Sequence, residues 1–418
     1  MIEKIRVSNF RSVVDVTLMF TYDEGKAPNG YEESPKLAFV EDAASGFRCV
    51  PIMAYYGANA SGKTNLLRAV VNLLDVASGT RCNDVRTIFK PNLISKVGRE
   101  TEFEIEYFAG SGSFRYLVAY SAEGLSHEQL FKNGQELFVV KKGHLSIGPA
   151  LRLTEAYTQQ TFQERLDGEC TDGQGHVIRS FLSLVGLHMG GASEDIRVAH
   201  AELANRVAVY GFDRPAILPQ AVHNLCEAAK ISQEEALDRI VDLVRRLDND
   251  LASVEVLELE DPKRRGVFYE IRSHHVSAEG RDVVFEYEQD ESAGTVRLAA
   301  MVGNLLSTIE RGSVCFIDEV ELSLHPLLVR ELLGLFRKKE FNRNGAQLIF
   351  TTHLTDIMDD QLLRLSEIGI VTKNKFNGSK VRRVIDMKNA GEDIRNVTNF
   401  RKRYLDGYFA GVPRGTIG

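Results

Sequence analysis

One stretch, residues 57–64, constrains the fold of this chain more than any other. Its sequence, Gly-Ala-Asn-Ala-Ser-Gly-Lys-Thr, fits the spacing G-x-x-x-x-G-K-[ST]. Apolar residues run from 51 to 56 before it, as in a buried strand, and recur at helical spacing from 65 to 74 after it. A glycine-rich turn between strand and helix leaves backbone N–H groups free and aims the positive end of the helix at one point. The segment therefore predicts a phosphate-binding loop in an α/β fold.

The residues of this loop have separate expected roles. Lys63 would reach the β- and γ-phosphates of a nucleotide, and the Thr64 hydroxyl would bind Mg²⁺. The remaining loop residues that would surround the phosphates are Gly57, Asn59, Ala60, Ser61 and Gly62. A chance glycine turn is the alternative, but the strand and the helix that the motif requires are both present. ATP and Mg²⁺ are thus the expected ligands.

The composition indicates a large globular protein. The chain has 418 residues, 44% of them hydrophobic, which is enough for two or three domains with a sizeable core. Its net charge of −7 gives no overall basic character that would favour nucleic acid. The five cysteines form no C-x-x-C pair, so neither a disulfide framework nor a zinc site is indicated. With no signal peptide and no apolar run of membrane-spanning length, a soluble cytoplasmic protein is expected.

Strand patterns predominate in the first part of the chain. Residues 2–7 and 13–20 are typical of a hairpin with a turn at 8–12, and residues 21–48 of an irregular loop. Period-two alternation over 101–142, interrupted by glycines, predicts an antiparallel meander.

Helical periods replace this pattern between residues 150 and 252. One helix is expected over about 176–186 and another over about 193–210. Ser232-Gln-Glu-Glu235 is a capping box that starts a third helix, which continues to about Asp250. The apolar faces of these helices are expected to pack against the rest of the protein.

Strands return after these helices, at 254–259, 267–276 and 283–287. The adjacent His274 and His275 lie inside the second of them. Alternation would put the two side chains on opposite faces, so we interpret them as structural residues and not as metal ligands.

Two adjacent carboxylates follow another buried strand. The apolar residues 314–317 run directly into Asp318 and Glu319. Such a strand delivers both side chains to the carboxyl edge of the sheet, where ligands of open α/β sheets bind. Asp318 can then hold the coordination shell of Mg²⁺, and Glu319 can orient and deprotonate the attacking water.

Three further segments flank these carboxylates in the sequence. Residues 291–297, Glu-Ser-Ala-Gly-Thr-Val-Arg, precede a helical pattern and would form a second anion site at a helix start. Residues 321–326, Glu-Leu-Ser-Leu-His-Pro, turn the chain into another helix, and the strand at 347–352 places His353 near the phosphates. Each piece alone favours a helix cap or a core histidine, but their order along the chain argues against coincidence.

In this order the segments resemble the motifs of ABC-type ATPase heads. The matching motifs are Walker A at 57–64, the signature at 292–297, Walker B at 314–319, the D-loop at 321–325 and the switch histidine at His353. The opening Ile5-Arg-Val-Ser-Asn-Phe-Arg-Ser resembles the start of RecF, SMC and OLD-family heads. The signature differs from the Leu-Ser-Gly-Gly-Gln of transporters, which argues against transport.

A still nearer resemblance is to compact bacterial AAA-labelled ATPases of abortive-infection and anti-phage defence systems, such as the PARIS and RloA-like ATPases. They share the phrases Glu-Ser-x-Gly-Thr-x-Arg-Leu and Asp-Glu-(x)n-Ser-Leu-His-Pro, and their tail resembles residues 403–413. The Q-loop glutamine of the family has no obvious counterpart here. The nuclease domain that follows the head in OLD proteins is not expected, so destructive chemistry would come from another polypeptide.

The resemblance implies an ABC-type ATPase head with a P-loop sheet, an antiparallel β subdomain and a helical insertion. Residues 1–149 would form the N-terminal part of the head, with Walker A and the meander. Residues 150–252 would form the insertion, and residues 253–418 the C-terminal part of the head.

The resemblance also implies ATP hydrolysis, with Lys63, Glu319 and His353 as catalytic residues and with Thr64 and Asp318 on Mg²⁺. Two subunits would pair head to tail, so that the signature of one closes over the nucleotide of the other. The signature residues expected to contact that nucleotide are Ser292, Gly294 and Arg297.

The leading functional hypothesis is a sensor or scaffold ATPase of an anti-phage system, with a phage-encoded trigger and a separately encoded toxic effector, often a nuclease. The alternative is a RecF-like, ATP-gated DNA clamp for repair. A third reading is a scaffold in which ATP only joins subunits. Between residues 373 and 403 there are ten basic residues and only three acidic ones, which bears on the DNA alternative. A solvated surface face is the more frequent explanation of such a stretch.

Overall fold

The structure is a computed structural model that describes most of the chain. The described residues are 1–22, 40–42, 47–80, 88–93, 100–110, 112–154, 156–189, 191–205, 207–210, 217–247, 252–261, 266–322, 325–374 and 378–409. Most of the expected loop at 21–48 lies outside these ranges, as do Cys82, Ser323, Leu324, Lys375 and the tail beyond residue 409.

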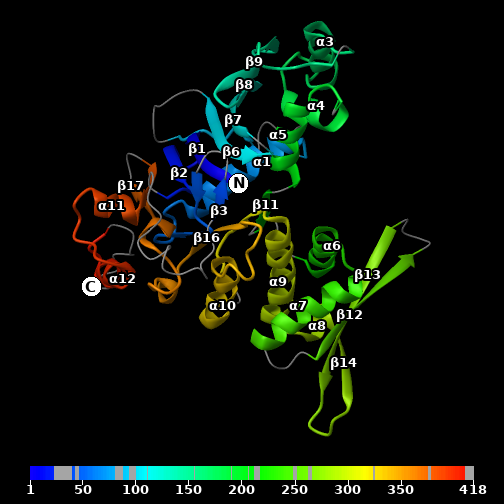
Figure 1. The fold of residues 1–418 in the computed structure, drawn as a ribbon, viewed down its shortest axis with the longest axis vertical. Coiled ribbons are helices and arrows are strands. Elements are labelled where there is room, and N and C mark those ends of the chain that lie inside the picture. The colour runs from blue at the N-terminus through cyan, green and yellow to red at the C-terminus, as the bar shows by residue number, and fades with distance from the viewer. Residues whose placement is uncertain are drawn as a thin grey trace.

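One sheet of 13 strands forms the framework of the fold (Figure 1). Its strands are β1 (Ile2–Phe10), β2 (Val13–Met19), β5 (Ile52–Tyr56), β6 (Thr101–Ala109), β7 (Gly112–Ser121), β8 (Gly124–Lys132), β9 (Gln135–Lys141), β10 (His144–Ile147), β11 (Val207–Tyr210), β15 (Val314–Ile317), β16 (Gln347–Thr352), β17 (Ile368–Asn374) and β18 (Gly378–Arg383). Their spatial order is β10-β9-β8-β7-β6-β1-β2-β18-β17-β5-β16-β15-β11. The sheet joins an antiparallel half to a parallel half.

The antiparallel half confirms the predicted hairpin and meander. β1 pairs with β2 and with β6, and β6 to β10 follow one another in antiparallel order. The turn expected at 8–12 is shorter than predicted, because β1 continues to Phe10 and only Arg11 and Ser12 lie outside the strands. Burial alternates along β6, as the period-two pattern predicts.

The parallel half is buried on both faces. β17, β5, β16, β15 and β11 are parallel neighbours. Ile52, Ala54 and Tyr56 of β5 pack into one hydrophobic core, whereas Met53 and Tyr55 pack into the other. Continuous apolar runs are typical of such strands because neither face meets water. The expected α/β class is confirmed.

Helices cover the two faces and define the two cores (Figure 1). The first core contains residues of α1 (Lys63–Ser78), α3 (Gln159–Glu169), α4 (Phe181–His188) and α5 (Glu194–Asn205). The second contains residues of α6 (Leu218–Ala229), α7 (Gln233–Leu247), α9 (Ala293–Arg311), α10 (Pro326–Arg337), α11 (Val384–Asn389) and α12 (Val397–Leu405). Residues 150–252 thus contribute helices to both cores, and their treatment as one insertion stays a prediction.

Two of the predicted helices have different limits in the structure. The helix expected over 193–210 ends at Asn205, and Val207–Tyr210 is instead the edge strand β11, paired with β15. This tetrapeptide, Val-Ala-Val-Tyr, has two β-branched residues and a tyrosine, and beside an open sheet edge it gains more from pairing than from continuing the helix. The helix expected from 176 starts at Phe181, where the Ser180 hydroxyl caps it by accepting from the backbone N–H of Ser183.

A separate three-stranded sheet projects from the helices of the second core (Figure 1). It consists of β12 (Ser253–Asp261), β13 (Gly266–Val276) and β14 (Asp282–Glu286), and α8 (Tyr287–Asp290) follows it. The strand and turn elements that complete the described chain are β3 (Val40–Asp42), β4 (Phe47–Cys49) and the 3₁₀ turns η1 (Thr355–Ile357) and η2 (Leu365–Glu367). We call β12–β14 the projecting sheet.

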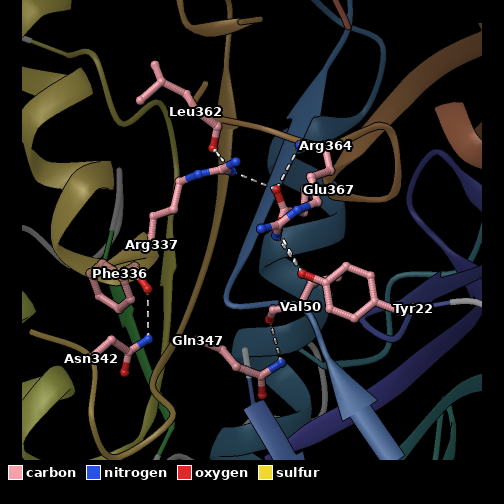
Figure 2. Close-up of polar contacts among 9 residues, drawn as sticks. All are labelled: Tyr22, Val50, Phe336, Arg337, Asn342, Gln347, Leu362, Arg364 and Glu367. Atoms are coloured by element: carbon pink, nitrogen blue, oxygen red, sulfur yellow. Dashed lines mark hydrogen bonds and ion pairs between the residues drawn. The ribbon is translucent and has the colours of Figure 1, made fainter. Parts of the chain in front are cut away.

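A buried polar network lies at the amino edge of the parallel strands (Figure 2). Glu367 is fully buried just before β17. Its carboxylate accepts from Tyr22 Oη at 2.9 Å and from Arg364 Nη1 at 2.7 Å, and Arg337 Nη1 lies 3.4 Å away. The network joins the first strands of the chain to its C-terminal half, which makes it a structural element.

No described helix combines the length and the apolar character that crossing a membrane would need. Among the described cysteines, Cys226 and Cys315 carry free thiols.

Candidate functional site

The predicted phosphate-binding loop lies between β5 and α1. Lys63 is the first residue of α1, and the preceding Gly62 has a φ of 107°. That conformation favours glycine, and a Cβ atom at this position would lie 2.1 Å from Ser379 Oγ. A Cβ atom at Gly57 would lie 2.3 Å from the carbonyl oxygen of Val371. Both glycines of the motif are therefore required by close backbone packing.

Three polar side chains outside the motif support the phosphate-binding loop through hydrogen bonds. They belong to Ser12, Asn65 and Ser379. Ser379 Oγ donates to the carbonyl oxygen of Ser61 at 2.7 Å and lies 2.9 Å from Ser12 Oγ. Asn65 Nδ2 donates to the same Ser12 hydroxyl at 2.8 Å. The β1–β2 turn and β18 thus support the loop, although they are more than 40 residues from it in sequence. The loop motif itself gives no signal for these three residues.

Lys63 contacts the loop and the switch histidine. Its Nζ donates to the carbonyl oxygen of Gly57 at 2.8 Å and to that of Ala58 at 3.3 Å. It also lies 3.0 Å from His353 Nε2, which follows β16. The structure therefore brings together Lys63 and His353, which are 290 residues apart in the chain.

The two carboxylates follow β15, and Thr351 of β16 bonds to the side chain of Asp318 and to the backbone of Glu319. Thr351 Oγ1 donates to Asp318 Oδ1 at 2.5 Å and accepts from the backbone N–H of Glu319 at 2.8 Å. The Thr351 carbonyl oxygen accepts from the N–H of Val320 at 3.2 Å. Glu319 has a φ of 48°, an uncommon conformation for a residue other than glycine. The contacts with Thr351 hold this strained backbone in place, a feature that concentrates at functional sites. No sequence motif of the chain distinguishes Thr351 from its neighbours in β16.

Glu321 lies at the same edge and orients the segment after β16. Its Oε1 accepts from the backbone N–H of His353 at 2.6 Å. Its Oε2 is buried and has no hydrogen-bond partner among the described residues. A buried carboxylate oxygen without a partner is unfavourable in a closed structure, and it is accommodated most easily where a ligand or a partner completes the site. The expected D-loop is described only in part, since Ser323 and Leu324 lie outside the described residues.

The electrostatics of the site follow from these positions. Burial lowers the pKa of Lys63, and the carboxylates of Glu319, Asp318 and Glu321 oppose that shift. Burial also lowers the pKa of His353, and the neighbouring Lys63 ammonium lowers it further. A neutral imidazole is therefore favoured, whose Nε2 can accept from the ammonium group.

The signature residues lie at the start of α9. Ser292 is the N-cap of this helix, and its hydroxyl accepts from the N–H of Thr295 at 3.1 Å. The structure gives Ser292 no hydrogen bond to Lys63, Asp318 or Glu319, all of which it describes. Gly294, in the first turn of α9, presents no side chain of its own.

Arg297 differs from the other two signature residues. Burial lowers the pKa of its guanidinium, and the carboxylates of Glu319 and Glu321 oppose the shift. Arg297 therefore lies within electrostatic reach of the Glu319 and Glu321 carboxylates of its own chain. Of the predicted signature residues, it is the one that the structure associates with this carboxyl edge.

The loop and the carboxylates fit a nucleotide phosphate with Mg²⁺. The exposed Asn59 and Ala60 form the crest of the loop, and the buried Ser61 hydroxyl has no hydrogen-bond partner in the described part of the chain. Mg²⁺ keeps several waters and takes one or two protein oxygens plus substrate phosphates. Asp318 and the half-buried Thr64 could supply those oxygens. Within the described ranges, no cluster of three or more His, Cys, Asp or Glu could hold a metal alone.

The arginines of the basic stretch at 373–403 lie next to acidic side chains. All five of its arginines form ion pairs, namely Arg382 with Glu392, Arg383 with Asp386, Arg395 and Arg403 with Asp393, and Arg401 with Asp356. An arginine that is already paired with a carboxylate is less available for a DNA phosphate. The solvated face is thus the better supported of the two interpretations.

A family model described as "AAA domain, putative AbiEii toxin, Type IV TA system" matches residues 52–359. The matched range starts at β5 and ends just after η1. It contains the predicted phosphate-binding loop, the predicted signature, Asp318, Glu319 and His353. No curated protein matches the sequence.

Three solved structures of SMC heads are similar over most of the chain. An SMC head bound to the C-winged helix domain of ScpA is 15% identical, with a TM-score of 0.49, and the match covers 91% of this chain and 97% of that one. An SMC head domain from Thermotoga maritima is 13% identical, with a TM-score of 0.41 and coverage of 91% and 98%. An SMC head with a coiled coil and joint from Pyrococcus yayanosii is 13% identical, with a TM-score of 0.44 and coverage of 94% and 99%.

Proposed function

The chain belongs to the family of AAA domains that carries the AbiEii-toxin description, and from this premise we propose that it binds and hydrolyses ATP as the sensor or scaffold of a bacterial anti-phage system. The observation that carries the ATPase proposal is the convergence of four side chains at one edge of the parallel sheet. These side chains are Lys63, Asp318, Glu319 and His353.

Each side chain of the site has a role in this proposal. Lys63 exchanges its present contacts with the loop carbonyls and His353 for the β- and γ-phosphates. Asp318 and Thr64 would hold Mg²⁺, which would neutralise the charge that develops on the phosphate oxygens. Glu319 orients the attacking water and takes its proton. His353 Nε2 lies 3.0 Å from Lys63 Nζ, so in this proposal it can contact the γ-phosphate and assist Glu319.

The proposal includes self-association. Ser292 and Gly294 lie at the start of a 19-residue helix, whose N-terminus is a favourable place for an anion. Ser292 has no hydrogen bond to the phosphate-binding loop of its own chain, and a second subunit placed head to tail would bring its signature to that loop. Such pairing would give an assembly of subunits that closes only when ATP is bound.

The biological role rests on the family and on surfaces that the ATP site does not use. The family description names a toxin of a toxin–antitoxin system. We propose that this chain, in the cytoplasm, controls a separately encoded toxic effector, such as a nuclease, in response to a phage-encoded trigger. The helices α3–α7 and the basic tail after β18 are the proposed docking regions, because no residue of the phosphate-binding loop or of the predicted Walker B motif lies on them.

The DNA-clamp alternative has less support. All five arginines of the basic stretch are paired with acidic side chains. Phosphate contacts would impose a steep dependence of DNA affinity on salt concentration. A steep slope for this chain, together with failure of any genomic neighbour to co-purify in every nucleotide state, would favour the clamp instead.

The test of the ATPase proposal uses Lys63→Ala in the full chain. The phosphates lose their flexible cation, so ATP affinity measured by calorimetry should fall by about 100-fold or more. Lys141→Ala, which removes an exposed lysine from the end of β9, is the matched control and should leave affinity unchanged. Equal ATP affinities of Lys63→Ala and wild type would contradict the assignment of the site.

A mixing experiment with the same variant tests the composite site. Gly294→Asp places a carboxylate opposite the partner's γ-phosphate and should block ATP-dependent closure. In a head-to-tail dimer of one Lys63→Ala subunit and one Gly294→Asp subunit, one site carries both lesions and the other carries neither. Partial recovery of ATPase activity on mixing is expected, and no recovery at any ratio would argue for sites that act within one chain.

A further inference from the structure

The projecting sheet is fastened to the chain immediately before the signature serine. Glu291 Oε1 lies 2.5 Å from His275 Nε2 and 2.5 Å from Ser273 Oγ, both on β13. Ser273 is fully buried, and the side chains of Glu291 and His275 are only 9% and 19% exposed. One carboxylate oxygen therefore serves as the joint between a strand of the projecting sheet and the residue that precedes Ser292.

The same short segment is anchored a second time. The hydroxyl of Tyr287, which is fully buried in α8, donates to the carbonyl oxygen of Thr295 at 3.2 Å. Thr295 in turn donates through its N–H to Ser292 Oγ. Ser292 thus lies between an anchor on Glu291 and an anchor on Thr295. Because consecutive Cα atoms are about 3.8 Å apart, a shift of Glu291 with β13 moves Ser292 with it.

We propose that Glu291 is a positioning residue, which sets the place of the signature serine through its contacts with His275 and Ser273. This inference rests on the proposed function, since it assumes that Ser292 closes over a nucleotide. It adds that the projecting sheet, which the ATP site does not otherwise need, determines the geometry of the signature. A change in the position of that sheet would then change the rate of ATP hydrolysis.

The adjacent histidine provides a natural contrast. His274 Nδ1 lies 3.0 Å from Asp282 Oδ2 of β14, and that carboxylate is 61% exposed. This pair joins two strands within the projecting sheet and does not involve the signature segment. His275, on the other face, contacts Glu291 and packs against the ring of Phe285 at 4.9 Å between centroids. Two neighbouring histidines thus have similar chemistry but different connections.

The experiment compares Glu291→Ala and His275→Ala with His274→Ala as the control, all in the full chain. The first two changes should lower kcat by about tenfold, because small displacements of a positioning group have large effects on rate. ATP affinity of the unassembled subunit should stay at the wild-type value, because the phosphate-binding loop is untouched. His274→Ala should retain the wild-type kcat.

Two further variants separate positioning from stability. Glu291→Gln keeps an acceptor oxygen and should recover most of the lost rate, and Ser273→Ala removes one of the two contacts and should lower kcat by about threefold. The double variant Glu291→Ala with His275→Ala should be no slower than the slower single variant, because both changes break one connection.

The outcomes distinguish this inference from the proposed function. If Ser292→Ala lowers kcat but Glu291→Ala and Ser273→Ala do not, the positioning role is wrong and the ATPase proposal stands. The same conclusion follows if His274→Ala is as slow as His275→Ala, because the loss then comes from the sheet in general. If Lys63→Ala leaves ATP affinity unchanged, the proposed function itself fails.

Discussion

The two edges of the parallel sheet contain buried charges that are satisfied in opposite ways. At the amino edge, the Glu367 carboxylate has two arginines and a tyrosine hydroxyl around it (Figure 2). At the carboxyl edge, the Lys63 ammonium bonds to two carbonyl oxygens and an imidazole, and Glu321 Oε2 has no partner among the described residues. β16 has six residues, so the two edges are about 20 Å apart.

The two edges of the same sheet therefore differ in role: the amino edge is structural and the carboxyl edge is the proposed functional site. A buried carboxylate that is surrounded by cations and a hydroxyl donor, as Glu367 is, makes the fold rigid and specifies its packing. A buried charge that is left with weak partners costs stability, and such groups occur where a ligand supplies what is missing. The amino edge therefore has the character of a structural network, and the carboxyl edge has the character of a site that a polyanion would complete.

The largest expected effect is on catalysis at the carboxyl edge. Glu319→Gln can still hold the attacking water but cannot take its proton, so kcat should fall by roughly 10²–10⁴-fold. ATP binding should remain and the closed assembly should accumulate, which size-exclusion chromatography with ATP would show. Near-normal turnover would move the general base elsewhere, with His353 as the next candidate.

A substitution at the amino edge should lower the free energy of unfolding and not kcat. Glu367→Gln leaves Arg337 and Arg364 beside a neutral amide, and loss of one member of a buried ion network costs about 3–5 kcal/mol. Denaturant unfolding would measure the loss. Glu392→Gln, which breaks the exposed pair with Arg382, is the control and should cost less than about 1 kcal/mol. A soluble Glu367→Gln protein with wild-type stability would remove the distinction between the edges.

The meander contains a third buried carboxylate, which has only uncharged donors. Glu128 accepts from Phe181 N at 2.7 Å, from Leu182 N at 2.9 Å and from Tyr116 Oη at 3.0 Å. Burial raises the pKa of Glu128 from 4.5 to about 7. Unlike Glu367, Glu128 has no arginine beside it. Its raised pKa is therefore the effect of desolvation that no neighbouring cation offsets.

The pH dependence of stability follows from the sign of that shift. Folding favours the protonated Glu128, so its contribution is complete below the unfolded pKa of 4.5 and is lost as the pH rises through about 7. The loss amounts to about 3 kcal/mol. Relative to Glu128→Gln, the wild type should lose that much stability between pH 4.5 and pH 8. If the free energy of unfolding of the wild type and of Glu128→Gln depended on pH in the same way, the raised pKa of Glu128 would be contradicted. Glu164→Gln, on α3, is the control for removal of an exposed charge.

Local sequence patterns were sufficient for the parts of the fold that depend on neighbours in the chain. The loop at 57–64, the hairpin and the meander follow from periodicity and turn residues, and the structure confirms these elements. The motif order predicts that Lys63 and Asp318 share one edge, because parallel strands bring their carboxyl ends together. The roles assigned to these residues remain predictions.

Other features depend on contacts between distant segments and could not be read from the sequence. Val207–Tyr210 continues a helical pattern, and only the open edge of β15 makes it a strand. Ser12 and Ser379 support the loop from positions 367 residues apart. Glu291 appears in the sequence as part of a signature phrase, and its contacts with β13 depend on how the projecting sheet folds back.

The smallest expected effect concerns Thr351, whose role was also invisible in the sequence. Thr351→Val keeps the shape of the side chain but removes the donor to Asp318 and the acceptor for the N–H of Glu319. We expect kcat to fall by about tenfold, the equivalent of one net hydrogen bond, with little change in ATP affinity. Thr351→Ser retains the hydroxyl and should keep near-wild-type turnover. If Thr351→Val and Thr351→Ser were equally active, the carboxyl edge would not need this hydroxyl, and the strained backbone of Glu319 would have to be held by other contacts.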